Sequence, residues 1–180
     1  MFGVESKHGV RTRRVWACAM TEGGRAPRPS DAATAKRMQL QRQRNTGCEL
    51  AVRRLLHAKG LRYRIDCRAE KGVPRRADIV VRPAKVAVFV DGCFWHGCPE
   101  HWKAPSRHET WWTNKVSANA KRDRETTLLL ERAGWLVIRA WEHEEPEAVA
   151  DRVLEAVRER HPRGARLRIA GGPRSSGKAR

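Results

Sequence analysis

Apolar and polar residues follow two different periods in the middle of the chain. Residues 46–59 begin with the spacing Thr46-x-x-Glu49 of a helix capping box, continue with apolar residues at helical spacing and stop at Gly60. Residues 31–44 contain good helix formers but few apolar side chains, which predicts a basic surface helix. Two helices are therefore expected before the first strand.

The next segments have the patterns of β-strands. Residues 61–67 alternate apolar Leu, Tyr, Ile and Cys with Arg and Asp, which predicts a strand with one solvated face. Residues 77–82 and 85–91 are β-branched runs separated by Pro83 and Ala84, and they predict a tight hairpin.

The rest of the pattern completes an α/β fold. After a loop at 92–107 that contains glycine and proline, we expect a long helix over 108–133, a fourth strand over 135–141 and a last helix over 144–160. This order suits a mixed sheet of about four strands flanked by helices. We expect one domain over residues 31–161.

The chain is strongly basic. It has 38 Lys and Arg against 20 Asp and Glu, a net charge of +18, which predicts a polyanionic partner. Residues 1–30 and 162–180 carry +10 of this charge, and their Gly, Pro, Ser and Arg content predicts two disordered basic tails. The remaining +8 belongs to the predicted domain, so the tails alone do not account for the charge.

The lack of recognisable targeting segments and the odd number of cysteines predict a cytoplasmic protein. No apolar run approaches the roughly 18 residues of a membrane span, and the N-terminus lacks the apolar core of a signal peptide. We therefore expect a cytoplasmic protein without membrane contact. In that reducing compartment the five cysteines are expected to be ligands, nucleophiles or buried apolar residues rather than disulfides.

A cysteine and histidine cluster predicts a metal site. Cys93-x4-Cys98-x2-His101 lies in the loop at 92–107, and His143 follows the fourth strand. Thiolate and imidazole are the ligands that tetrahedral Zn²⁺ prefers, and a closed set of four indicates a structural ion. His96 also fits by spacing, so one of the three histidines is surplus. The alternative is two buried free cysteines beside surface histidines.

Asp78, at the start of an apolar strand, is a candidate ligand for a hard cation. A carboxylate there is costly unless something compensates it. If the hairpin turns as predicted, Asp78 lies opposite Phe89 and beside Val90, whose carbonyl could share a Mg²⁺ ion. A plain strand-end aspartate is the alternative. His96 could instead be a general base, since its usual pKa is about 6.5. Glu49 could simply cap its helix.

Tryptophan is over-represented, with seven residues against one tyrosine. Planar rings among basic residues suit stacking on bases or wedging between base pairs. For Trp111, Trp135 and Trp141 we instead expect positions in the core. Five aromatic residues lie in or beside the cysteine and histidine loop: Phe94, Trp95, Trp102, Trp111 and Trp112.

The segment DIVVRPAKVAVFVDGCFWHGCPEHW, residues 78–102, resembles the very short patch repair (Vsr) DNA mismatch endonucleases, and the resemblance extends over about residues 30–160. It implies a restriction-endonuclease-like fold, a structural Zn²⁺ and a Mg²⁺-dependent centre that nicks one DNA strand. The implied substrate is a T:G mismatch left by deamination of 5-methylcytosine, cut on the 5′ side of the thymine. A monomer at the bacterial nucleoid, with mismatch-repair proteins as further candidate partners, is the implied setting.

The resemblance assigns roles by position. Asp78 would bind Mg²⁺ with the Val90 carbonyl, His96 would be the general base, and Glu49 would support the active site. The zinc ligands would then be Cys93, Cys98, His101 and His143.

Aromatic residues complete the implied roles. Phe94, Trp95 and Trp112 would wedge into the duplex beside the mismatch, with Met38 in the opposite groove. Asp91 departs from the family pattern, which has histidine there, and is a candidate second carboxylate for Mg²⁺.

Further departures are Ala77, where many members have proline, and the order of cysteine and histidine in the zinc loop. Two other functions compete with this one. One is a zinc-stabilised DNA-binding protein that cuts nothing, and the other is a nuclease with a different DNA target.

Overall fold

A four-stranded mixed sheet organises the part of the chain that the structure describes. The computed structural model describes residues 27–28, 31–33, 35–36 and 46–161. The sheet has the order β1-β2-β3-β4, with β1, β2 and β3 antiparallel and β4 parallel to β3. The strands are β1 Arg64–Cys67, β2 Ala77–Val81, β3 Val86–Asp91 and β4 Leu136–Trp141. The predicted mixed sheet is confirmed.

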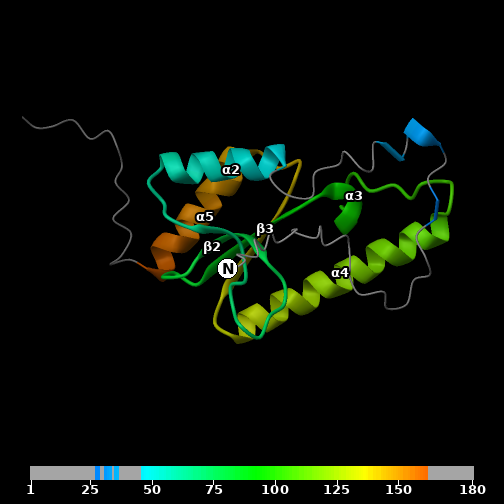
Figure 1. Cartoon of the computed structure of the whole chain (residues 1–180). Helices are drawn as coiled ribbons and strands as arrows, with labels where there is room; N and C mark the ends of the chain where they lie inside the picture. The colour runs from blue at the N-terminus through cyan, green and yellow to red at the C-terminus, as the bar shows by residue number, and fades with distance from the viewer. Residues whose placement is uncertain (1–26, 29–30, 34, 37–45, 162–180) are drawn as a thin grey trace, which may run out of the picture.

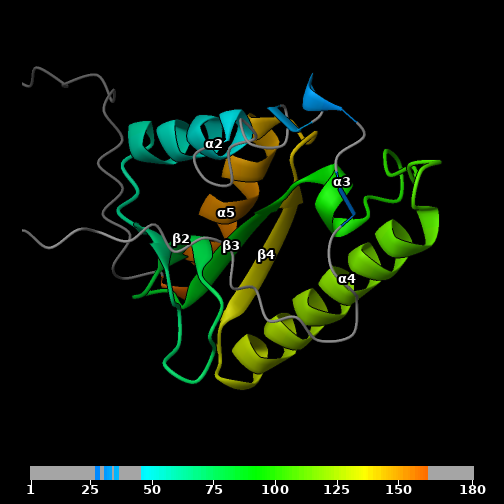
Figure 2. The same ribbon diagram turned by 45° about the vertical axis from the view of Figure 1, so that its right-hand side comes forward.

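Helices cover both faces of this sheet. Helices α2 (Gly47–Ala58) and α5 (Pro146–Arg160) lie together on one face, and α4 (Glu109–Arg132) runs along the other (Figures 1 and 2). The short helix α3 (Cys93–His96) follows β3 and packs against α4. Each face has its own apolar core, one centred on α2 and α5 and one that includes Leu130 of α4 and Trp135.

The β2–β3 hairpin has the predicted register. The turn is closed by the Lys85 N–H, which donates to the Arg82 carbonyl at 3.0 Å. Continuing the ladder by one step places Asp78 opposite Phe89. The observed pairs are Ile79 with Val88, Val80 with Ala87 and Val81 with Val86.

Two local predictions were wrong. Strand β1 begins at Arg64 instead of residue 61, and Ile65 is 52% exposed instead of buried. Strand β1 lies at the edge of the sheet, so one side of it has no neighbouring strand among the described residues. The second error is the loop after β3, where residues 93–96 form α3, which ends at Gly97 with a φ of 70°.

The N-terminal helix and the tails are described only in part. Residues 32–33 and 35–36 are helical, within the helix expected over 31–44, and the rest of that helix lies outside the described residues. The tails at 1–30 and 162–180 lie almost wholly outside them, so their predicted disorder stays a prediction. Among the described helices, none is both long enough and apolar enough to cross a membrane.

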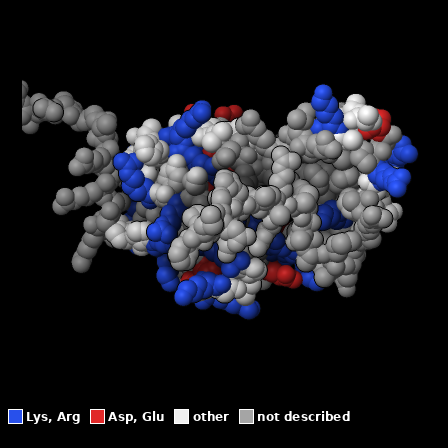
Figure 3. Space-filling model, in the orientation of Figure 1, with Lys and Arg blue, Asp and Glu red and all other residues white. Residues whose placement is uncertain are grey.

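Basic side chains are spread over the surface. In Figure 3, Lys and Arg occur across the visible face of the described residues, whereas Asp and Glu form only small patches. This agrees with the net charge of +8 that the sequence assigns to residues 31–161. A positive surface of this kind favours association with a polyanion.

Leu56 of α2 gives a test of the core assignment. Its side chain is fully buried, so Leu56→Ala should lower the free energy of unfolding by about 3 kcal/mol through lost apolar burial and the cavity that remains. Urea unfolding measures this change. Leu129 on α4 is 45% exposed, and Leu129→Ala should alter stability by less than about 0.5 kcal/mol. Equal losses in the two variants would contradict this core.

Candidate active site and metal centre

Asp78 closes the end of the β2–β3 ladder with its side chain. Its Oδ2 accepts a hydrogen bond from the Val90 N–H at 2.8 Å, as a backbone carbonyl would farther along the ladder. Burial raises the pKa of Asp78 to about 6, although the Val90 hydrogen bond opposes this rise. The carboxylate is therefore poorly compensated by its protein neighbours, and a bound cation would stabilise its charged form.

The backbone of Val90 faces the same carboxylate. The Glu142 N–H donates to the Asp91 carbonyl at 2.9 Å, so Asp91 faces β4 and the preceding residue, Val90, faces β2. Within a strand, the N–H and C=O of one residue point to the same side. The Val90 carbonyl thus points toward the Asp78 side of β3.

Glu49 is tied to Asp78 through Arg53. The Glu49 side chain is buried and forms an ion pair with Arg53 at 3.1 Å. Arg53 Nη2 in turn donates to the Asp78 backbone carbonyl at 3.4 Å. Thr46 Oγ1 accepts from the Glu49 N–H, as the predicted N-cap requires. Glu49 therefore takes part in the N-cap of its helix and also helps to fix the start of β2.

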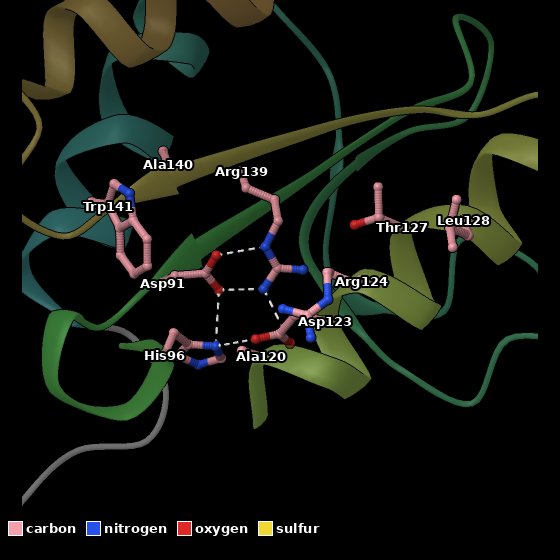
Figure 4. Close-up of a pocket in the computed structure, with 10 residues that line it drawn as sticks. All are labelled: Asp91, His96, Ala120, Asp123, Arg124, Thr127, Leu128, Arg139, Ala140 and Trp141. Atoms are coloured by element: carbon pink, nitrogen blue, oxygen red, sulfur yellow. Dashed lines mark hydrogen bonds and ion pairs between the residues drawn. The ribbon is translucent and has the colours of Figure 1, made fainter. Parts of the chain in front are cut away.

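His96 is held by two carboxylates that the fold brings to it. Its Nδ1 lies 2.6 Å from Asp123 Oδ2 and 3.5 Å from Asp91 Oδ1. Asp123 comes from the middle of α4 and Asp91 from the end of β3, and Figure 4 shows both side chains turned toward the imidazole. Neither carboxylate was predicted from the sequence as a partner of His96.

Arg139 of β4 joins the two carboxylates. Its Nε and Nη2 each bond one oxygen of Asp91 at 2.6 Å, and Nη2 also lies 3.1 Å from Asp123 Oδ1. Both Asp91 oxygens accept a hydrogen bond from the guanidinium, so the charge of Asp91 is offset by a side chain of the protein.

These contacts shift the ionisation of His96 and Asp123. Burial by itself lowers the pKa of His96, but the hydrogen bond to Asp123 and the charge of Asp91 outweigh it and raise that pKa above its usual value. Burial raises the pKa of Asp123, yet His96 and Arg139 together lower it below its usual value. The pair thus favours an ionised Asp123 that accepts from His96.

A cleft opens beside this network. It has a volume of about 480 Å³ and lies between β4 and α4, with His96, Asp123 and Arg139 among its lining residues (Figure 4). Thr127 and Leu128 of α4 form the opposite wall. The histidine is therefore reachable from outside through a hollow rather than enclosed in the core.

The four predicted zinc ligands converge. The sulfur-to-nitrogen distances are 3.8 Å and 3.1 Å from Cys93 to His101 and His143, and 3.6 Å and 3.8 Å from Cys98 to the same rings. Sulfur and nitrogen ligands of a tetrahedral Zn²⁺ lie about 3.6 Å apart. All four ligand atoms lie within 4.8 Å of one another, so the set fits this ion.

The chemistry of the thiols also fits a cation. Burial, followed by the neighbouring Cys98 thiol, raises the pKa of the Cys93 thiol to about 11. A bound metal reverses such a shift because the thiolate is the ligand. The Cys93 N–H donates to Glu142 Oε1 at 2.7 Å, which ties the loop to the residue beside His143.

Helix α3 is held against α4 by close packing. A Cβ atom at Gly97 would lie 2.6 Å from Val116 Cγ1, so only glycine fits at this contact. Asn119 Nδ2 also donates to the Trp95 carbonyl at 2.7 Å. These contacts fix the helix that carries His96.

Three of the predicted DNA-contacting aromatic residues form one cluster. The Phe94 ring lies 5.3 Å from that of Trp95 and 5.2 Å from that of Trp112, and Trp111 lies 4.8 Å from Trp112. Phe94 and Trp95 are partly exposed, whereas Trp112 is buried beneath them. Met38 lies outside the described residues.

The core positions expected for three tryptophans are only partly found. Trp135 is buried, as expected, in the core beside α4. Trp111 and Trp141 are half-buried instead, because one packs on the aromatic cluster and the other lines the cleft.

Asp123 and Arg139 were not among the site residues predicted from the sequence. Asp123 sits in a run of charged residues on α4, where nothing in its spacing distinguishes it from a solvated side chain. Arg139 carried a usable signal, because it is a charged residue within an otherwise largely apolar strand, as Asp78 is.

Comparison with known proteins places this site in a family. Residues 30–103 match the family model described as DNA mismatch endonuclease Vsr. The type II nicking enzyme V.NaeI of Lentzea aerocolonigenes is 42% identical over 136 residues, which cover 74% of this chain and 82% of that protein.

Two further relatives show similar coverage. The type II nicking enzyme V.NmeDIP of Neisseria meningitidis serogroup C is 38% identical over 69% of this chain and 86% of its own length. DNA mismatch endonuclease Vsr of Escherichia coli (strain K12) is 32% identical over 62% of this chain and 70% of its own length. On these matches, the chain belongs to the Vsr family of DNA mismatch endonucleases.

Proposed function

We propose that this chain is a Mg²⁺-dependent endonuclease that nicks one strand of duplex DNA on the 5′ side of the mispaired thymine in a T:G mismatch, the product of 5-methylcytosine deamination. The observation that carries the proposal is the 2.6 Å hydrogen bond between His96 Nδ1 and Asp123 Oδ2, at the end of the sheet that also carries Asp78. An oriented histidine near a carboxylate that needs a cation suits metal-assisted phosphodiester hydrolysis.

His96 is the proposed general base. An ionised carboxylate can only accept hydrogen bonds, so Asp123 requires the proton of a neutral His96 ring to be on Nδ1. The lone pair is then on Nε2, which takes a proton from the attacking water. Asp123 also stabilises the imidazolium that forms.

Asp78 and the Val90 carbonyl would hold the Mg²⁺ ion. When bound, the ion neutralises the charge that develops on the scissile phosphate. The raised pKa of Asp78 supports this role, because a carboxylate that is disfavoured as an anion gains most from a cation. Glu49 supports the site through Arg53, which fixes the start of β2.

A structural Zn²⁺ ion would be held by Cys93, Cys98, His101 and His143. Its proposed role is to fix the loop that contains α3, because two of the ligands flank that helix. A structural ion of this kind contributes directly to folding stability.

Mismatch recognition is assigned to the aromatic cluster. Phe94 and Trp95, supported from below by Trp112, would enter the duplex beside the mismatch, with Met38 on the opposite groove. A mispaired step costs less to open than a paired one, which favours T:G over fully paired DNA.

The setting of the enzyme is proposed from the same family. A monomer with a restriction-endonuclease-like domain over residues 31–161, flanked by basic tails that hold DNA phosphates, would act at the nucleoid in a bacterial cytoplasm. Mismatch-repair proteins are candidate helpers.

Asp78→Ala and His96→Ala test the mechanism. Each should lower the rate of strand nicking on a T:G duplex in Mg²⁺, by about 10²- to 10⁴-fold for loss of the base, while duplex binding persists. Nicked product on a denaturing gel and a binding assay measure the two properties. Asp151→Asn, at an exposed aspartate of α5, is the matched control and should cut normally. Wild-type binding without any scission would favour the non-cutting DNA-binding protein.

Metal analysis tests the cysteine and histidine site. The purified protein should contain about one zinc per chain, and Cys98→Ser should lose it and melt at a lower temperature, because one ligand of four is removed. Cys48→Ser, at a half-buried cysteine outside the cluster, should keep the metal. A wild-type protein that binds no zinc would refute the ligand assignment.

A panel of duplexes tests the preference for T:G. Wild type should nick T:G duplexes faster than fully paired duplexes in at least one sequence context, and Phe94→Ala should reduce that ratio because a wedging ring is lost. Initial nicking rates over all mismatches provide the comparison. Equal rates on mismatched and paired DNA would point to a nuclease with another target.

A further inference from the structure

The guanidinium of Arg139 occupies the cluster formed by Asp91, His96 and Asp123. Their ligand-type atoms lie within 4.8 Å of one another, as in a metal site, but the guanidinium of Arg139 bonds both carboxylates. The four residues come from four separate elements: β3, α3, α4 and β4. A fixed side-chain cation therefore stands where these carboxylates would otherwise attract a metal ion.

We propose that Arg139 is a positioning residue of the active site, which binds both oxygens of Asp91 and directs Asp123, so that Asp123, the nearer carboxylate, orients the imidazole. The inference rests on the proposed role of His96 as general base. Arg139 itself contacts no reacting group, and it acts through the two carboxylates.

The position and the orientation of the Arg139 guanidinium are both fixed by its neighbours. It forms two parallel 2.6 Å hydrogen bonds with Asp91, whose side chain is only 7% exposed, and bidentate pairs of this kind have strict geometry. The Phe89 ring lies under it, with the centroid 5.0 Å from the guanidinium carbon. Nη2 is thereby directed at Asp123 Oδ1.

Two carboxylates compete for one hydrogen atom on His96. Asp91 Oδ1 lies 3.5 Å from Nδ1 and Asp123 Oδ2 lies 2.6 Å from it. Arg139 engages both oxygens of Asp91 and offsets its charge, whereas Asp123 Oδ2 forms the short hydrogen bond with Nδ1. Without a cation the two carboxylates would also repel each other, and Asp123, which is a quarter exposed, is free to turn toward solvent.

A purely structural role for the buried Asp91–Arg139 pair must be separated from positioning. Removing one partner leaves an unpaired buried charge and destabilises the fold. The double variant Asp91→Asn/Arg139→Gln avoids this problem because it removes both charges and leaves side chains that can hydrogen-bond. It is therefore the main test variant.

The double variant should fold and bind DNA but turn over slowly. We expect a melting temperature close to that of wild type and a KM within about twofold. We expect kcat to fall by about 10- to 100-fold, because Asp123 loses the Arg139 Nη2 contact that directs it at His96. Arg139→Lys should have an intermediate kcat, since an ammonium keeps the charge but not the fork geometry. Lys59→Gln, which removes an exposed basic residue paired with Asp151, is the charge control and should match wild type.

Coupling to Asp123 gives a readout that a structural role would not produce. In wild type, Asp123→Asn should lower kcat by about 10- to 100-fold, but in the double variant it should cost less than about threefold, because the orienting contact is already lost. Single-turnover nicking rates at saturating enzyme and Mg²⁺ measure all four proteins of this cycle.

Three results would overturn the inference. The first is wild-type kcat in the double variant while His96→Ala abolishes nicking, which removes the role of Arg139 and leaves the proposed function intact. The second is independent, multiplying effects of Asp123→Asn and the double variant. The third is full activity of His96→Ala, which removes both this inference and the mechanism on which it rests.

Discussion

In the parallel ladder between β3 and β4, Asp91 pairs with Trp141 at the end of both strands. When two neighbouring parallel strands end at the same level, the segments that follow them begin side by side. The segment after β3 carries Cys93, and the segment after β4 carries His143. A ring nitrogen of His143 lies 3.1 Å from the Cys93 sulfur. The same ladder brings Arg139 within reach of Asp91. One strand pairing thus determines the place of the cysteine and histidine cluster and of the charge network beside it.

The carboxylates near the end of the sheet differ in how far neighbouring cations offset their charge. Asp91 and Asp123 share the guanidinium of Arg139, so their negative charge is offset within the protein. Asp78 receives one backbone N–H, and the nearby Arg53 is already paired with Glu49, so burial raises the pKa of Asp78. We therefore propose Asp78 rather than Asp91 as the ligand of a divalent ion, although the ligand atoms of Asp91, His96 and Asp123 all lie within 4.8 Å of one another.

Contacts between residues that are close in the sequence could be predicted, whereas contacts between distant segments could not. The hairpin is local, so its turn was enough to place Asp78 against Val90, and the spacing of cysteine and histidine was enough to suggest a metal. Spacing alone left a surplus histidine, and only the family resemblance removed His96 from the zinc set. The contact of His96 with Asp123 depends on how α4 packs across the sheet, and periodicity carries no information on that packing. The exposure of Ile65 was misjudged because β1 is the edge strand, and the alternation of a segment does not tell which place its strand takes in the sheet.

We infer that the proposed base takes its position from the cysteine and histidine cluster and from α4 together. A one-turn helix such as α3 has no stability of its own, because nucleating a helix costs more than a single turn returns. It is held at both ends by cluster residues, Cys93 and Cys98, and on one side by the contact of Gly97 with Val116. His96 therefore takes its direction from neighbours that are far from it in the sequence. For that reason a substitution of Cys93 or Cys98 should lower the nicking rate as well as the stability, even though neither residue touches the DNA phosphate in the proposed mechanism.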